Sequence, residues 1–240
     1  MKIGIKLYNP DFRYLKKIID YVDFIELTAQ RGKDYSFLKD FDIPFTLHNE
    51  HWAFGVNPAN SKLHERNIES TAFSLDLANR INAKFIVIHP GFIEKYHCSR
   101  KTAMDFLKEL DSRFVVENMP GRLPLHMKAE TIGAKFEDIR KILQVTGKRF
   151  CLDFGHAAAT ACILGIDHVE FISKVLKLKP AYFHISDSNT ESKTDEHLHL
   201  GMGNLNIRAF KNMIPSDSWV VIETFPDFEQ QLKDITFMRA

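Results

Sequence analysis

Eight short apolar segments alternate with eight longer segments of helical spacing along this chain of 240 residues. We expect strands at residues 2–7, 22–27, 43–47, 84–88, 113–116, 149–152, 181–183 and 219–222. Most of them are apolar throughout, which is typical of parallel strands buried on both faces. We expect helices at residues 12–20, 35–40, 61–81, 100–110, 135–145, 167–178, 207–213 and 228–237.

This alternation predicts an α/β protein with a single (β/α)8 TIM barrel. Parallel strands joined by helices need right-handed crossovers, and the chain is close to the size of about 250 residues that is typical of such barrels. An open doubly wound sheet is the alternative, but the first strand, MKIGIKLYNP, lacks the GxGxxG fingerprint. Because no linker or second core is visible, we expect one domain over residues 1–240.

Residues of metal-ligand type lie at the C-terminal ends of the apolar segments or in the loops directly after them. They are His48, His89, Glu117, Asp153, His156, His184, Asp195, His197 and Glu223. In a parallel barrel these strand ends meet at one mouth. Imidazole and carboxylate without thiolate suit zinc, manganese, iron or cobalt and indicate a catalytic site. One catalytic zinc usually takes three protein ligands, so nine ligands suggest two or three ions.

Taken singly, each of these residues has a structural alternative, since a strand-end Asp can cap the next helix. In LDFGH we expect a bend at Gly155 to direct Asp153 and His156 into one mouth. Three further residues have open alternatives. Glu26 either points towards the mouth or forms a buried salt bridge, and Asp187 either contacts the substrate or a ligand's second nitrogen, or caps a loop. His199 either orients a ligand imidazole or has no role at the site. His51 is expected to be solvated or to cap a turn. Loop cations are candidates for binding phosphate: Lys95, Arg100, Arg122 and Lys128.

Several motifs together resemble those of endonuclease IV. They are HPGF at 89–92, ENMPG at 117–121, LDFGHA at 152–157, HISDS at 184–188, DEHLHLGMGN at 195–204 and IET at 222–224. Those apurinic/apyrimidinic endonucleases belong to the xylose-isomerase-like barrel superfamily. The resemblance implies a divalent-metal-dependent phosphodiester hydrolase that uses two or three Zn²⁺ ions and cleaves abasic duplex DNA.

The resemblance also implies how the ligands divide into three sets. The first set is His48, His89 and Glu117. The second is Glu117, Asp153, His184 and Glu223, so that Glu117 bridges two ions. The third is His156, Asp195 and His197. The chain departs from the family's pattern at Glu196, because an acidic side chain replaces a basic one that faces DNA phosphate and is expected to repel the DNA backbone.

A metal-dependent isomerase or epimerase acting on a small sugar or sugar phosphate is the alternative. Glu117, Asp153, His184 and Glu223 would then hold one Mn²⁺ or Mg²⁺, and Glu117 and Glu223 would be the catalytic acid/base pair that moves a proton beside a carbonyl. This alternative leaves the other five ligands without a role. A metal-dependent binding protein without catalysis is a third possibility, because a fold alone does not assign chemistry.

Overall composition adds little about partners. The formal net charge of +1 neither supports nor excludes nucleic acid, and no protein partner can be inferred. The three cysteines have no CxxC spacing, which is typical of reduced thiols. No apolar run approaches the roughly 20 residues that cross a bilayer, and the N-terminus does not resemble a signal peptide. We therefore expect a cytoplasmic protein that does not enter a membrane.

Overall fold

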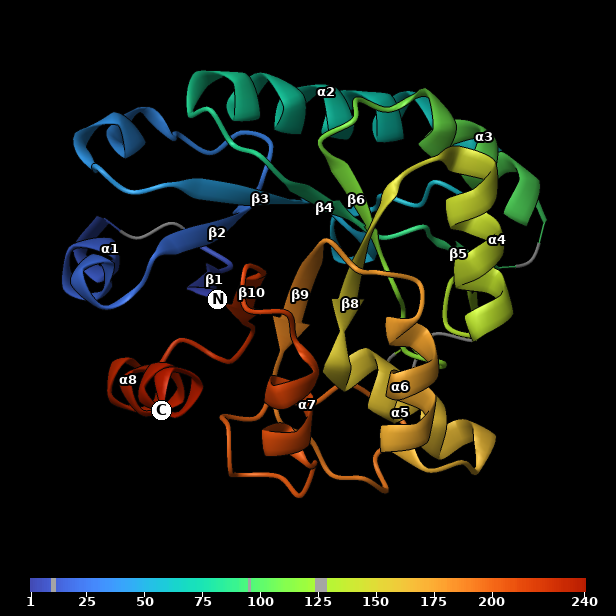
Figure 1. Cartoon of the computed structure of the whole chain (residues 1–240). Coiled ribbons are helices and arrows are strands. Elements are labelled where there is room, and N and C mark those ends of the chain that lie inside the picture. Colours follow the sequence, from blue (N-terminus) through green and yellow to red (C-terminus); the bar gives the residue numbers. More distant parts are fainter. Residues whose placement is uncertain (10–11, 95, 124–128) are drawn as a thin grey trace.

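The computed structural model describes residues 1–9, 12–94, 96–123 and 129–240. Eight parallel strands close into a barrel in the order β1-β10-β9-β8-β6-β4-β3-β2 (Figure 1). The strands are β1 (Lys2–Leu7), β2 (Phe24–Ala29), β3 (Phe45–Asn49), β4 (Ile86–Ile88), β6 (Phe114–Glu117), β8 (Arg149–Asp153), β9 (Tyr182–Ile185) and β10 (Trp219–Ile222). The predicted TIM barrel is confirmed, and each predicted strand boundary lies within two residues of the observed one.

Helices surround the barrel on its outside (Figure 1). They are α1 (Phe12–Ile18), α2 (His64–Arg80), α3 (Arg100–Glu109), α4 (Phe136–Thr146), α5 (Phe154–Leu164), α6 (His168–Leu176), α7 (Ile207–Met213) and α8 (Phe228–Arg239). Short 3-10 helices lie at η1 (Ile19–Tyr21), η2 (Ser36–Asp40), η3 (Trp52–Phe54) and η4 (Ser61–Leu63). The helix predicted at 35–40 is thus the short 3-10 helix η2, and it is the one helical element between β2 and β3.

Two features escaped the sequence analysis. The first is α5, whose residues 154–161 are all buried, so that no polar face produces a helical period. The second is a small antiparallel pair, β5 (Phe92–Ile93) with β7 (Glu130–Thr131), which ties the loop after β4 to the loop after β6. Two-residue strands leave no alternating pattern for sequence analysis to detect.

The interior of the barrel has an apolar lower layer. It contains Phe24, Val115, Cys151, Tyr182 and Val221, all buried and packed together. Side chains two residues apart on a strand point to the same face, so the next inward position on each of these strands lies one layer nearer the mouth. Gly4 belongs to the same lower layer, because a Cβ atom there would lie 2.6 Å from the Phe24 ring.

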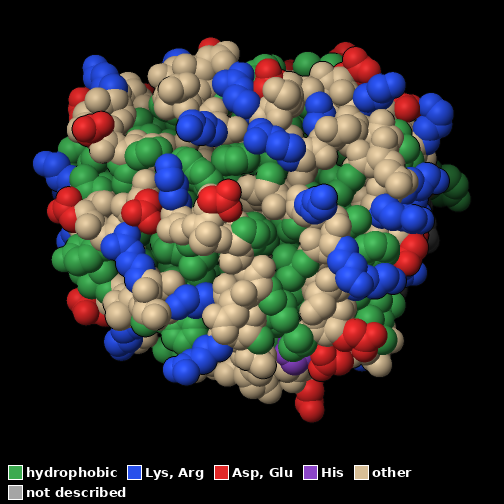
Figure 2. Space-filling model, viewed as in Figure 1, with side chains coloured by type: hydrophobic (Ala, Val, Ile, Leu, Met, Phe, Trp, Pro, Cys, Tyr) green, Lys and Arg blue, Asp and Glu red, His purple; other side chains and the backbone are tan. Residues whose placement is uncertain are grey.

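Charged side chains of both signs are scattered over the outer face seen in Figure 2, among hydrophobic and uncharged groups. None of the described helices combines the length and the apolar character required to cross a membrane.

Candidate metal centre

Above the apolar lower layer, the interior of the barrel has a layer of ionisable residues. Advancing two residues along each strand from the lower layer gives Lys6, Glu26, Glu117, Asp153, His184 and Glu223. All six are buried, with exposed fractions of 4% or less. So many ionisable groups in a barrel interior are costly unless they pair or bind ions. This layer therefore marks the site.

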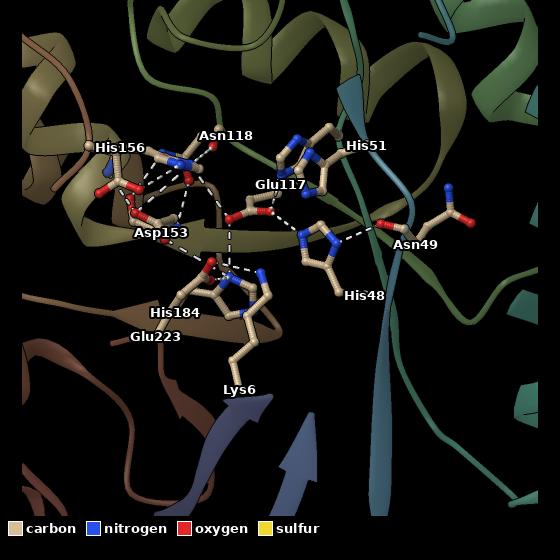
Figure 3. Close-up of polar contacts among 12 residues, drawn as sticks. Lys6, His48, Asn49, His51, Glu117, Asn118, Asp153, His156, His184 and Glu223 are labelled. Atoms are coloured by element: carbon tan, nitrogen blue, oxygen red, sulfur yellow. Dashed lines mark hydrogen bonds and ion pairs between the residues drawn. The ribbon is translucent and has the colours of Figure 1, made fainter. Parts of the chain in front are cut away.

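Glu117, at the end of β6, occupies the centre of the group (Figure 3). Its Oε2 lies 3.2 Å from Nε2 of His48 and 3.0 Å from Nε2 of His89. Its Oε1 lies 3.0 Å from Nδ1 of His184 on the other side. The carboxylate thus faces two groups of potential ligands with different oxygens.

Two of the three ligand sets implied by the resemblance are compact in the structure. Among the described residues, His48, His89 and Glu117 form one group whose ligand atoms all lie within 4.8 Å of one another. Glu117, Asp153, His184 and Glu223 form another, and a third group of this kind replaces Asp153 and Glu223 with Cys151. Burial raises the pKa of the Cys151 thiol well above its usual value, which makes this residue a poor ligand.

The third set, His156, Asp195 and His197, is linked through Asp195. Oδ2 of Asp195 lies 2.6 Å from Nε2 of His197 and 3.5 Å from Nε2 of His156. These residues do not form one of the groups with all ligand atoms within 4.8 Å. The structure therefore brings the set to the same mouth but in a looser arrangement.

Asp153 and His156 meet because α5 begins directly after β8. The Asp153 side chain caps this helix by accepting a hydrogen bond from the His156 backbone N–H at 2.6 Å. The predicted bend at Gly155 is wrong, because Gly155 is helical. Glycine is required there by space instead: a Cβ atom would lie 2.9 Å from Oδ1 of Asp195.

The loop that carries Asp195 and His197 is held by Asp187. Its Oδ1 accepts hydrogen bonds from the backbone N–H groups of Ser188 and Leu205, and its Oδ2 accepts those of Gly201 and Gly203. This assigns Asp187 to the loop-capping role, the second of its two predicted alternatives.

The second nitrogen of four histidines makes a hydrogen bond that orients the ring. Nδ1 of His48, His156 and His197 lies 2.7–3.0 Å from the backbone carbonyls of Asn49, Asn118 and Glu223 respectively. Nε2 of His184 lies 3.0 Å from Oε2 of Glu26. If the ring nitrogen donates in each case, the other nitrogen keeps a lone pair directed into the site. This pattern is typical of histidines that bind metals.

Buried oxygens without hydrogen-bond donors provide a second sign that divalent ions fit here. Four carboxylate oxygens, judged against the described part of the chain, accept no hydrogen bond: Glu26 Oε1, Asp153 Oδ2, Asp195 Oδ1 and Glu223 Oε2, the last of which lies 2.7 Å from Nδ1 of His184. Buried carboxylate oxygens are normally satisfied, and a bound divalent ion would supply the missing partner. The residues present therefore fit a metal centre built from imidazole and carboxylate.

The electrostatics of the site agree with an excess of negative charge. Burial, together with the nearby Asp195 and Glu117 carboxylates, raises the pKa of Asp153 to about 7 even though His156 lowers it. Burial lowers the pKa of His89 to about 4, so its ring is neutral and able to bind a metal at neutral pH. Burial alone would lower the pKa of His197, but Asp195 raises it to about 9.

Other predicted residues have mixed outcomes. Glu26 is fully buried and pairs with His184, which is the salt-bridge alternative. His199 does not orient a ligand, since its Nδ1 lies 2.6 Å from Oδ2 of Asp234 on α8. The Glu196 carboxylate accepts hydrogen bonds within its own loop, from Ser188 Oγ and the Asn189 backbone N–H. The repulsion of DNA by Glu196 stays a prediction.

Of the cations predicted to bind phosphate, the two that the structure describes have different surroundings. Arg100 is paired with Glu130 at 2.7 Å, and Arg122 lines the mouth. Lys95 and Lys128 lie outside the described residues.

Two residues at the mouth, Lys6 and Tyr8, were missed by the sequence analysis, and a third, His51, was expected only to be solvated or to cap a turn. Lys6 and Tyr8 both donate hydrogen bonds to Oε1 of Glu223. His51 caps η3 as one alternative had it, but its ring centre also lies 5.3 Å from that of His89. Its pKa is held well below the usual value by burial and by the neighbouring histidines. All three line a cavity of about 240 Å³ above the candidate ligands.

A closed parallel barrel with imidazole and carboxylate ligands at its C-terminal mouth defines a TIM barrel with a candidate metal centre. The chain belongs to the xylose isomerase-like TIM barrel family, whose model matches residues 12–240. It is 24% identical over 234 residues to an uncharacterized protein of Methanocaldococcus jannaschii, and the match covers 88% of this chain and 86% of the relative. It is 26% identical over 205 residues to endonuclease 4 of Thermus thermophilus, and this match covers 79% of this chain and 73% of the relative.

A solved structure described as a D-tagatose 3-epimerase-like protein has the same fold. The TM-score is 0.78 at 19% sequence identity, and the match covers 100% of this chain and 96% of that chain. The sequence relatives thus include a named endonuclease, and the structural neighbour is named as an epimerase-like protein, so the names found belong to enzymes of two kinds.

Proposed function

We propose that this chain is a divalent-metal-dependent phosphodiester hydrolase that resembles endonuclease IV and cleaves duplex DNA at abasic sites. The observation that carries the proposal is the position of Glu117, whose two oxygens face different ligand groups. One oxygen lies within 3.2 Å of His48 and His89, and the other lies 3.0 Å from His184. A carboxylate in this position suits two neighbouring ions, the arrangement used in two-metal phosphodiester hydrolysis.

The residues of the site have defined tasks in this proposal. The three ligand sets would hold two or three Zn²⁺ ions, which supply Lewis acidity towards the phosphoryl group when bound. Glu26 holds Nε2 of His184, so that Nδ1 faces the ligand set. Asp187 holds the loop of Asp195 and His197, and the Asp153 cap fixes the start of α5.

The size of the cavity at the mouth suits a substrate unit of one sugar. Its cavity of about 240 Å³ is lined by Tyr8, Trp52 and Arg122 in addition to the ligands. Ligand pockets usually measure about 300–1,000 Å³, so this one suits a single sugar with its phosphate. An abasic nucleotide and a free sugar phosphate both present such a unit, and the endonuclease 4 of Thermus thermophilus favours the first.

The second candidate function is a sugar isomerase or epimerase with one Mn²⁺ or Mg²⁺. It is favoured by the compact set of Glu117, Asp153, His184 and Glu223, which needs no other ligand. The proton transfers would require Glu117 and Glu223 to act as acid and base. Both oxygens of Glu117 face histidines, and Oε1 of Glu223 is held by Lys6 at 2.6 Å. These contacts make the hydrolase the stronger proposal.

Incubation of the zinc-loaded protein with a duplex that contains one abasic site tests this function. We expect cleavage on the 5′ side of that site and a loss of about 100-fold or more for His89→Ala, on the scale of losing a metal ligand or its support. His64→Ala is the matched control. His64 begins α2 on the outer surface, so this variant should cleave the duplex at the normal rate. An intact abasic duplex, together with epimerisation of a ketose, would instead establish the second candidate.

A further inference from the structure

Lys6 is a buried cation within the candidate metal centre. Its side chain, 4% exposed, rises from β1 towards Glu223 and His184 (Figure 3). Its Nζ lies 2.6 Å from Oε1 of Glu223 and 3.8 Å from Oε1 of Glu26. A buried lysine is rare unless it is paired, so this position requires both carboxylates.

The two carboxylate oxygens of Glu223 have different contacts. Oε1 accepts hydrogen bonds from Lys6 at 2.6 Å and from the Tyr8 hydroxyl at 3.2 Å. Oε2 accepts no hydrogen bond and lies 2.7 Å from Nδ1 of His184, inside the second ligand set. Glu223 therefore has one oxygen in use and one directed at the set.

We propose that Lys6 is a positioning residue that sets the metal preference of the second ligand set, by confining Glu223 to one ligand oxygen. The set then presents one atom each from Glu117, Asp153, His184 and Glu223. Four donors of imidazole and carboxylate type suit zinc, which is commonly four-coordinate, better than manganese, which prefers octahedral oxygen-rich sites. The inference rests on the proposed metal centre and not on the choice of DNA as substrate.

Removal of the ammonium group has two separable consequences. The loss of a positive charge beside the set favours every divalent ion to a similar extent. The release of Oε1 allows Glu223 to bind through both oxygens, which favours only an ion of higher coordination number. The ratio of zinc affinity to manganese affinity thus reports the constraint on Glu223, whereas a general loss of structure lowers both affinities together.

The test is a competition of Zn²⁺ and Mn²⁺ for the full metal-free chain against a chromophoric chelator. All proteins carry His89→Ala and His197→Ala, which disable the first and the third ligand sets, so that the ratio reports the second set. We expect Lys6→Met to shift the affinity ratio towards manganese by about tenfold, on the scale of changes to groups that support metal ligands. Lys6→Arg retains a donor to Glu223 and should restore most of the zinc preference. Lys2→Met, the same change at the other end of β1, is the matched control and should have no effect.

Tyr8→Phe provides a second variant that keeps the ammonium group. It removes the weaker donor to Oε1, so we expect a smaller shift in the same direction, even if Lys6→Met does not fold. An unchanged ratio in both variants, or an equal loss of zinc and manganese affinity, would overturn the proposal. No substrate enters the measurement, so a failure to cleave abasic DNA leaves this inference standing.

Discussion

Asp187→Asn is expected to destabilise the protein and to remove one metal ion without touching a ligand. The Asp187 carboxylate accepts four backbone hydrogen bonds, two on each oxygen, and it holds the loop that carries Asp195 and His197. Asparagine has nearly the same shape but presents only one acceptor oxygen. The N–H groups on the other side would then face an amide donor.

The structure gives the size of this effect. Hydrogen bonds to a charged acceptor contribute about 1.5–3 kcal/mol each, so two of them set a range of about 3–6 kcal/mol. The two N–H groups on Oδ2 belong to Gly201, which is exposed, and Gly203, which is half-buried. Water can replace part of what they lose, so we expect the free energy of unfolding to fall by about 3 kcal/mol.

Urea unfolding of the metal-free protein measures this loss, and elemental analysis of the zinc-loaded protein counts the ions. We expect the variant to bind one zinc fewer than the wild type, because the third set needs the ordered loop. Asp167→Asn is the matched control: Asp167 caps α6 through one backbone N–H, and asparagine caps a helix equally well. A loss below about 1 kcal/mol with unchanged zinc content would refute the role assigned to Asp187.

Three further predictions concern the support of the ligands. Gly155→Ala places a Cβ atom 2.9 Å from Oδ1 of Asp195, so zinc titration should show about tenfold weaker binding at the third set; unaltered binding would contradict the close packing. Glu26→Gln removes the carboxylate that orients His184 and should weaken zinc binding by about 10–100-fold, and equal affinity would show that the ring is fixed by other contacts. In the metal-free protein the raised pKa of His197, about 9 against 6.5, means that its protonated ring stabilises the fold fully below pH 6.5 and that this contribution is lost as the pH rises through 9. His197→Gln should therefore flatten the decline of the urea midpoint between these values, and a parallel decline in both proteins would exclude this linkage.

The barrel was predictable because its strands are continuous apolar runs. Buried on both faces, they need no alternation, and each predicted strand lies within two residues of the observed one. The same burial conceals α5, since a helix that is covered on all sides has no polar face to reveal its period. The mistaken bend at Gly155 has a different origin: a glycine in a sequence suggests a flexible backbone, whereas here the small size of the residue is what the packing requires.

The candidate ligands were predictable because strand ends of one type converge in a parallel barrel. Lys6 was missed because lysine is usually exposed, so that a lysine in a strand first suggests a solvated edge. The sequence did contain a signal. Lys6 lies between the apolar residues Ile5 and Leu7, and because it follows Gly4 by two residues, both point to the same face of β1, the interior of the barrel. The pairing of its ammonium with Glu223 depends on contacts 217 positions apart in the sequence, which no local pattern encodes.

Elemental analysis of the purified protein, with Glu117→Gln alongside, tests the central claim most directly. A shared carboxylate between two ligand groups predicts two or three zinc ions per chain, and the variant should lose more than one ion because Glu117 belongs to two sets. A single manganese or magnesium ion per chain, or a variant that loses one ion only, would contradict the bridging position of Glu117.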